Sequence, residues 1–592
     1  MPEFNTVNSI DYVLIGMYFI IILWVGMYAA RKSKSTDEYF RGGGRIPWVI
    51  AGLSNWVSGY SAFMFVAAAG FTYRYGLGAV VIFTSAFWAY LLGYWIFGKR
   101  WRRARIHSPL EFLTRRYSPS TTYFYSVTAI IPQVVGIGQG LYILCIFVST
   151  ALGVNDKNFD LAVVMLSGFQ LSVIVTGAVM VLYSVIGGLW AAVLSDTVQA
   201  IIIAVMSIII FPVSYSYLGE GNGIAAGFAR LLRETPESYF SLSGEAANFL
   251  FLLSYLINVI LGYNVGWAIV QRYHSVADER DTKKMALLCA VLAVIGPLLW
   301  ILPVMASRII FPDINTLWPT LAVPAEASFV SLALMLLPHG LIGFVVSAIL
   351  SATLGQANDS FNWLAATLTR DVYAPVKKRL TGTLPSDTVQ LLVARITMLV
   401  VGILGIGVAL YIPTLGGAFE FALGFYSLTA AFSMPVALGL LYTRTPWWSG
   451  IASCSAAIAV ALGLMAFGVW NEHTFVRNML SESFVATTVF FGSALWFKKH
   501  DLHKSEILKF EEDLRTPVIV EHLETVPGTL RVYGFIGRIC FLLGGVLLIC
   551  TILPSTPLAP STLNTVAGTM LILLGGIIWY ATRERLPVLV ED

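Results

Sequence analysis

The 592-residue sequence is poor in charge and in cysteine. Only 12% of its residues are Asp, Glu, Lys or Arg, about half the share that soluble domains carry, which excludes a soluble multidomain enzyme. Five cysteines in a chain of this length exclude a secreted disulfide scaffold. A net charge of +4, thinly scattered, gives no argument for a nucleic-acid partner.

Apolar residues are abundant instead, at 57% of the sequence, and the mean hydropathy is +0.77. A helix needs about 20 apolar residues to cross a bilayer. About fifteen runs approach this requirement, at 10–30, 46–72, 77–98, 122–150, 166–187, 190–216, 248–270, 284–308, 329–353 (continuing as a polar helix to Tyr373), 392–412, 417–442, 447–469, 483–497, 532–553 and 563–581. The sequence therefore predicts an all-α, multi-pass membrane protein, and we expect the first run to be retained, because its basic residues follow it.

The basic residues also predict an orientation. With strict alternation of the spans, 28 Lys and Arg fall on the side that includes 31–45 and 6 on the other. Basic loops face the cytoplasm, so we expect the N-terminus outside and the C-terminus inside. The run Lys99–Arg105 is interpreted as a topological anchor rather than a lipid-headgroup or nucleic-acid site.

Two connecting segments have a character of their own. The external segment 218–247 is expected to hold a short lid helix. The segment 498–530 contains charges of both signs, which predicts a solvated surface helix. His500 and His503 in the latter are interpreted as exposed polar residues rather than metal ligands. No nucleotide-binding loop, hydrolase or metalloprotease motif occurs, so we predict no enzyme and no ATP-driven pump. The function class that remains is passive or gradient-driven transport of a solute.

Two spans contain polar and glycine-rich interruptions, at Ser54–Ser61 and Asn258–Gly266. Inside a bilayer, irregular backbone is tolerated where it lines a cavity, and paired broken helices indicate the central site of a transporter. The two lie five spans apart, so their halves have opposite orientations, as an inverted repeat requires. The alternative is that Gly and Ser merely allow close helix packing.

Ionisable residues within spans are costly and indicate function by default. Asp196, followed one helical turn later by Gln199, begins the sixth span, and Asn358 and Asp359 lie in the extension of the ninth. Glu420 opens the eleventh and is interpreted as a boundary residue that reaches water.

Four segments resemble the sodium:solute symporter family, which includes the bacterial sodium/galactose and sodium/proline symporters. They are Ser35–Trp48, Tyr183–Gln199, the pair Gln271-Arg272 and Thr367–Tyr373. The resemblance covers about residues 10–470 and implies a LeuT-like 5+5 inverted-repeat core, with one helix before it and three to four after, about 14–15 transmembrane helices in all. It divides the chain into an N-terminal helix and loop (1–45), two repeats (46–216 and 248–442) and peripheral helices (446–592, with the loop 498–530).

The resemblance also implies a sodium site between the first and eighth core helices. The positions that supply backbone ligands in the family correspond to Val57, Tyr60 and Ala352 here. The two positions that supply side-chain hydroxyls in the family correspond to Gly355 and Gln356. Glycine supplies no side-chain oxygen, whereas the Gln356 amide oxygen could replace one ligand. If the register of the helix is shifted, Ser351 and Thr353 could supply the hydroxyls instead. Asp196 matches an acidic position on the inner cation pathway.

The positions with which the galactose symporter holds its sugar are all apolar here: Met64, Phe83, Ala86, Val259, Ala293 and Leu423. Unpaired buried hydroxyls cost about 1–3 kcal/mol each, so we expect the solute not to be a hexose. A monocarboxylate, amino acid or similar small solute fits better, with polar contacts expected from Ser58, Ser61, Asn258, Tyr263 and Asn264.

The sequence thus predicts a secondary active transporter of a bacterial inner membrane, a monomer or weak oligomer among lipids, which couples a small solute to sodium and needs no other cofactor. Two alternatives remain open. One is a sodium-independent carrier of the same fold, coupled to protons or working by exchange, and the other is a transporter-like sensor or channel.

Overall fold

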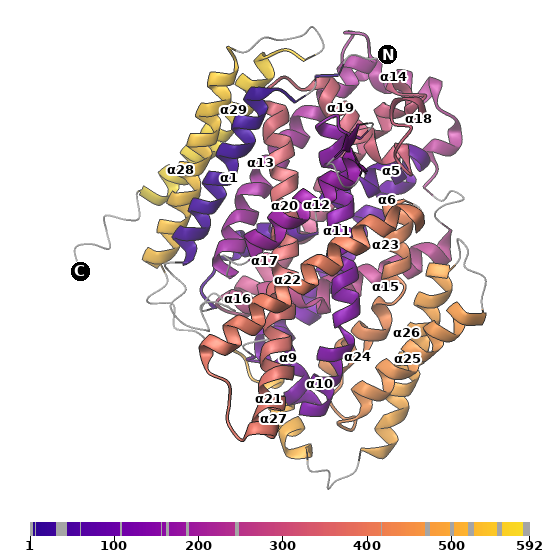
Figure 1. Ribbon diagram of the computed structural model, residues 1–592, viewed down its shortest axis with the longest axis vertical. Coiled ribbons are helices and arrows are strands. Elements are labelled where there is room, and N and C mark those ends of the chain that lie inside the picture. The colour runs from indigo at the N-terminus through magenta and orange to yellow at the C-terminus, as the bar shows by residue number, and fades with distance from the viewer. Residues whose placement is uncertain are drawn as a thin grey trace.

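The computed structural model is a tall bundle of helices with a single short hairpin of strands (Figure 1). It describes residues 4–5, 7–30, 44–59, 61–106, 109–155, 157–160, 165–184, 189–242, 248–415, 417–467, 474–497, 503–518, 526–552 and 559–583. All five cysteines are free and buried.

The helices of the first half run from α1 to α14. Their bounds are α1 (Ser9–Ala30), α3 (Trp48–Ser58), α4 (Ala62–Phe65), α5 (Ala67–Tyr75), α6 (Gly78–Thr84), α7 (Ala86–Leu92), η2 (Gly93–Phe97), α8 (Gly98–Arg103), α9 (Pro109–Arg116), α10 (Pro119–Thr128), α11 (Ile130–Ala151), α12 (Gly168–Ser184), α13 (Leu189–Leu218) and α14 (Ile224–Glu234). The antiparallel strands β1 (Asn158–Asp160) and β2 (Met165–Ser167) join α11 to α12.

The second half runs from η3 to α29. Its elements are η3 (Glu237–Phe240), α15 (Phe249–Val265), α16 (Trp267–Ser275), α17 (Glu279–Ile310), α18 (Ile314–Leu317), η4 (Pro324–Ala327), α19 (Ser328–Leu336), α20 (Leu341–Thr367), η5 (Leu368–Tyr373), α21 (Ala374–Thr381), α22 (Asp387–Tyr411), η6 (Ile412–Leu415), α23 (Ala418–Tyr426), α24 (Thr429–Leu441), α25 (Ser449–Phe467), α26 (Thr474–Ser493), η7 (Ala494–Trp496), α27 (Lys504–Arg515), α28 (Val526–Cys550) and α29 (Thr562–Arg583).

Helices occupy all fifteen predicted runs, which confirms the all-α membrane class. Among the described residues, seven helices are long and apolar enough to cross a bilayer, or up to ten if each of three bent pairs counts as one span. The lid helix expected within 218–247 is present as α14. The repeat boundaries and the orientation of the termini stay predictions.

The run at 329–353 is not one continuous helix. It divides into α19 and α20 because Pro338 has no N–H to continue the ladder and Gly340 adopts a φ of +92°. The buried Asp11 carboxylate of α1 then accepts hydrogen bonds from the Gly340 and Gly343 N–H groups, at 2.7 and 3.1 Å, and so caps α20. The ninth span therefore begins at Leu341, twelve residues later than the apolar run suggests.

The peripheral helices cover two sides of the bundle (Figure 1). The pair α28–α29 lies beside α1, where the Trp24 and Phe535 rings are 4.8 Å apart, and α25–α26 pack against α24. The surface helix expected in 498–530 is α27, but it is not solvated all round: Ile507, Phe510 and Leu514 are buried. His500 lies outside the described residues.

Candidate functional site

The first predicted interruption is a true break. The helix α3 ends at Ser58, and the chain resumes as α4–α5 after a bend of 49°. A Cβ on Gly59 would lie 2.1 Å from the Tyr263 hydroxyl oxygen, so only glycine allows α15 to approach the break this closely. Tyr263 therefore marks where the two interrupted helices meet.

The helix α20 lies against the same break. The Thr353 hydroxyl oxygen accepts a hydrogen bond of 3.1 Å from the Ala62 N–H, the first helical donor after the break, and donates its own proton to the Ile349 carbonyl. Thr353 is buried, as is Ala352 before it. The two segments that a sodium site of the predicted kind requires are thus adjacent.

The structure separates the five predicted sodium ligands. Val57 and Ala352 are buried at this junction, and Gly355 is buried one turn further along α20. The Gln356 side chain is exposed instead of facing the break, so Thr353 is the hydroxyl of α20 that reaches it. Tyr60 lies outside the described residues, and the side chains of Asn358 and Asp359 do too.

A buried ion pair lies beside this junction. The Asp196 carboxylate of α13 accepts hydrogen bonds from the Arg272 guanidinium of α16 at 3.2 Å and from the Ser54 hydroxyl of α3 at 2.6 Å. The exposed fractions of the Arg272 and Asp196 side chains are 0% and 6%. A Cβ on Gly355 would be 3.3 Å from the second Asp196 oxygen, so α20 packs directly on the carboxylate. The predicted cation-pathway residue is therefore held by a fixed cation of the protein itself.

One turn along α13, the Gln199 amide donates to the Ser351 hydroxyl at 2.6 Å, and both side chains are buried. Two consecutive turns of α13 thus bond to the partners that surround the break, Asp196 through α3 and α16 and Gln199 through α20.

The second interruption lies at the end of the predicted segment Asn258–Gly266. The helix α15 runs without a break through Asn258 and Gly262 and ends at Val265, and a bend of 40° follows at Gly266. A third bend, of 46°, separates α23 from α24 and was not predicted. There the Ala431 N–H in the first turn of α24 donates to the buried Glu482 carboxylate of α26 at 3.0 Å.

One of the predicted substrate positions, Phe83, lies within a cluster of aromatic rings. Phe83 of α6 contacts the rings of Phe63, Tyr255, Trp300 and Phe419, which come from α4, α15, α17 and α23, at centroid distances of 5.5–6.5 Å. The other apolar positions are buried, at Met64, Ala86, Val259 and Ala293, or half-buried, at Leu423.

Most of the predicted polar contacts are already occupied. Ser58 donates to the Ser54 carbonyl, and the Ser61 hydroxyl accepts from the Phe63 N–H to cap α4. The Asn264 amide donates to the Ala89 and Ile260 carbonyls at 2.9 and 3.0 Å. The buried Asn258 is different, because its amide makes no hydrogen bond with the part of the chain that the structure describes.

At the opposite end of the bundle from α27, Glu326 of η4 joins several elements. Its buried carboxylate accepts hydrogen bonds from the Ala418 and Phe419 N–H groups at 2.6 and 3.3 Å, which caps α23. Burial, and then the negative charge of Glu420, raises the pKa of Glu326 to about 8. Glu420 itself is partly exposed and pairs with Arg74 at 2.7 Å, as expected of a boundary residue.

No functional role for Arg272, Glu326 or Glu482 is predicted from the sequence. Arg272 was noted only as part of a motif, and Glu326 and Glu482 are lone carboxylates at the edge of or within apolar runs. That isolation was a usable sign, because an uncompensated carboxylate in such a run needs a specific partner.

Comparisons with known proteins bear on the family and the fold. The family model described as "Sodium:solute symporter family" matches residues 39–447. The Aliivibrio fischeri sodium/sialic acid symporter NanT is 25% identical over 78% of this chain and 88% of its own. Sodium/myo-inositol cotransporter 2 of Rattus norvegicus is 24% identical over 78% of this chain and 70% of its own. A solved structure of a substrate-bound, outward-open Na⁺-coupled sialic acid symporter superposes with a TM-score of 0.67 and 20% identity, covering 83% of this chain and 98% of that one, and so shows the LeuT-like fold.

The buried ion pair predicts a non-additive stability effect. Asp196→Asn or Arg272→Gln alone should destabilise the protein by about 3–5 kcal/mol, because each leaves a buried charge unpaired. The double variant should lose less than the two singles together, as measured by thermal unfolding in detergent. Arg230→Gln, which breaks surface pairs with Glu220 and Glu234 and a hydrogen bond of 3.3 Å to the Leu218 carbonyl, is the control and should cost about 1 kcal/mol or less. Strict additivity of the singles would contradict the pairing.

The close approach at Gly59 predicts a rescue. Gly59→Ala should cost about 1–3 kcal/mol, because its methyl group collides with the Tyr263 hydroxyl. Adding Tyr263→Phe removes the nearest atom and should restore part of the loss of melting temperature. Gly262→Ala on α15 is the control, since a Cβ there meets nothing within 4 Å. Equal losses for Gly59→Ala and Gly262→Ala would show that the contact is absent.

Glu326 predicts a pH dependence. Its pKa in the folded protein, about 8, lies above the ordinary value of 4.5, so the unfolded chain binds fewer protons over this interval and stability falls as pH rises from 4.5 to 8. Glu326→Gln keeps an acceptor for the Ala418 N–H but cannot titrate. Between pH 5 and 8 the melting temperature of the wild type should fall by at least about 2 °C more than that of the variant. Parallel curves would exclude Glu326 as the titrating group.

Proposed function

The chain belongs to the sodium:solute symporter family, as its motifs predicted, and we propose that it is a sodium-coupled secondary transporter of a small organic anion or zwitterion that works by alternating access. It is a multi-pass membrane protein. The observation that carries the proposal is the hydrogen bond between the Ala62 N–H and Thr353, because it joins the broken first core helix to the eighth.

The proposed cation site lies at this junction. The carbonyls of Val57, Tyr60 and Ala352 supply hard oxygen ligands, which suit Na⁺ whatever the side chain. Thr353 provides the side-chain oxygen of α20 at this site, because Gly355 has none and the Gln356 side chain is exposed away from the break. The Asp196–Arg272 pair brings no net charge to the neighbouring interior, so it neither repels nor neutralises the ion.

The proposed solute has few hydroxyl groups. Around Phe83 the walls are aromatic and aliphatic, and a hexose would leave several hydroxyls unpaired there. The Asn258 amide and the Tyr263 hydroxyl, both on α15, are left to hold a polar head such as a carboxylate. Sialic acid, which two of the relatives transport by name, carries a carboxylate but also several hydroxyl groups, so it belongs in the test panel as the check on the limit on hydroxyl groups.

The decisive experiment is uptake by the purified protein in proteoliposomes, with an inward gradient of Na⁺ or of K⁺. We expect uptake of a monocarboxylate or an amino acid to require Na⁺, and uptake of glucose and of sialic acid to be absent. Uptake that does not depend on Na⁺ but is driven by a pH gradient would favour the proton-coupled alternative. Uptake of glucose would refute the proposal that the solute has few hydroxyl groups.

Thr353→Ala tests the cation site within the same assay. It removes the hydroxyl oxygen and should raise the Na⁺ concentration needed for half-maximal uptake about tenfold, the effect of losing about 1.4 kcal/mol. Ser347→Ala is the matched control on α20, because its buried hydroxyl donates only to the Gly343 carbonyl of the same helix. An unchanged Na⁺ requirement in Thr353→Ala would remove Thr353 from the site.

A further inference from the structure

A basic pocket of about 630 Å³ lies at the end of the bundle where α8 and α27 meet. Its walls come from three places in the chain: η2 and α8, the segment after α24, and α27. Five of the lining side chains are cationic, and one, Glu511, is acidic. The cations are Lys99, Arg100, Arg103, Arg444 and Arg515.

The basic residues around α8 form two groups: some are bonded to other parts of the fold, and others make few bonds or none among the described residues. Arg102 donates to the Ala277 carbonyl at 2.6 Å, and Arg103 forms a two-point pair with Glu279 at 2.7 and 3.0 Å, so both serve the fold. Lys99 makes no hydrogen bond with any described residue, and Arg100 donates through one nitrogen only, to the Leu440 and Leu441 carbonyls. A topological anchor explains neither this separation nor the pocket.

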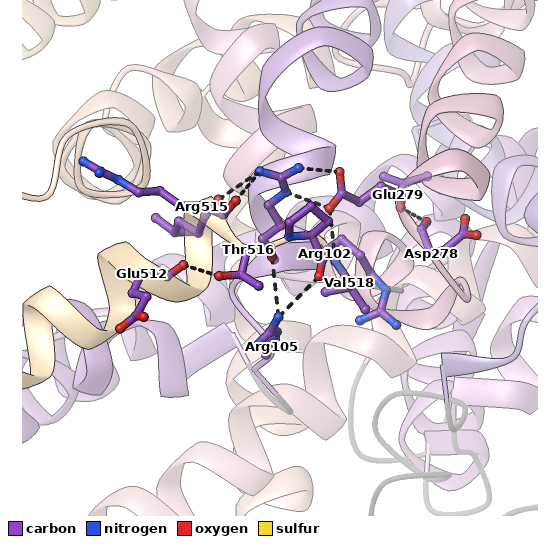
Figure 2. Close-up of polar contacts among 12 residues, drawn as sticks. Arg102, Arg105, Asp278, Glu279, Glu512, Arg515, Thr516 and Val518 are labelled. Atoms are coloured by element: carbon purple, nitrogen blue, oxygen red, sulfur yellow. Dashed lines mark hydrogen bonds and ion pairs between the residues drawn. The ribbon is translucent and has the colours of Figure 1, made fainter. Parts of the chain in front are cut away.

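The helix α27 forms one wall of the pocket, through Glu511, Leu514 and Arg515. Figure 2 shows Arg515, the last residue of α27, and Thr516 after it, lying against the segment that carries Arg102 and Arg105, with Glu279 on the other side. The Arg515 side chain pairs with Glu511 at 2.5 Å but remains 72% exposed, and Arg444 is 3.8 Å from the same carboxylate and 62% exposed. One carboxylate is therefore shared by two exposed cations, and the pocket keeps an excess of positive charge.

The remaining wall is apolar. Trp95, Ile96 and Leu441 line the pocket, and their side chains are exposed on the outside of the bundle, at 58%, 36% and 36%. Trp95 lies near the end of a span, where aromatic side chains mark the boundary between the hydrocarbon and the headgroups. An occupant must accordingly present negative charge at one end and hydrocarbon at the other.

We propose that this pocket binds the headgroup of an anionic phospholipid, whose phosphate lies among Lys99, Arg100 and Arg444 and whose acyl chain follows Trp95 and Leu441. Basic pockets between transmembrane helices on the cytoplasmic side hold such headgroups, and the distribution of Lys and Arg assigns this end of the bundle to the cytoplasm. The bound lipid ties the end of α8 to the segment after α24 and to α27, three parts that are far apart in the chain.

The test uses the full-length protein in an uncharged detergent, with lipid adducts counted by native mass spectrometry. The probes are phosphatidylglycerol, phosphatidylcholine with the same acyl chains, and inorganic phosphate. The wild type should bind one phosphatidylglycerol in preference to phosphatidylcholine. Lys99→Gln/Arg444→Gln should weaken this binding about 30-fold, since each basic residue near an anionic headgroup contributes about 1 kcal/mol and 1.4 kcal/mol corresponds to tenfold.

Two controls keep the result interpretable. Lys378→Gln/Arg379→Gln removes the same charge from exposed positions on α21, outside the pocket, and should leave the affinity for phosphatidylglycerol unchanged. Arg444→Gln alone changes one exposed side chain, should leave the melting temperature unchanged and should weaken binding about fivefold. Equal losses in the pocket and α21 variants, the absence of any preference over phosphatidylcholine, or displacement of the lipid by inorganic phosphate would each overturn the proposal.

Discussion

Every backbone N–H inside a bilayer needs a partner, and the structure meets this requirement in a recurring way. At four places where a helix starts or bends, a free N–H group is bonded by a side chain from a different helix. Thr353 does so after the first break, Glu326 at the start of α23, Glu482 after the third bend and Asp11 at the start of α20. These bonds fix where the bends lie, and the bends fix which residues surround the centre of the bundle.

The same bonds bear on movement. A transporter of this fold must change the relation between its broken helices and the helices around them, and each cap is a discrete contact that such a change would break or exchange. The caps come from α1, η4, α20 and α26, so the bent helices are held from several sides. The peripheral helix α26 is thus joined to the core through Glu482 by more than packing alone.

Charge inside the bundle is organised so that little of it is left unpaired. Asp196 has Arg272 and Ser54 as partners, and the three residues come from three different helices. Around the predicted solute positions the polar groups are largely bonded within the protein, and the walls are aromatic. The proposal of a compact solute that brings its own charge rests on this arrangement.

Sequence alone determined the membrane class, the positions of the helices, the break after Ser58 and the family, because hydropathy, glycine content and short motifs are local properties of the chain. It placed the ninth span too early, since a run of apolar residues does not show where a turn such as Pro338–Gly340 interrupts it. It gave the second bend only as the segment Asn258–Gly266, and the bend lies at the end of that segment. Only the tertiary structure decided the partners: Arg272 for Asp196, Thr353 instead of Gln356 at the break, and Glu482 at a bend that no motif announced. These contacts join residues 51 to 291 positions apart, and their geometry depends on how whole helices pack.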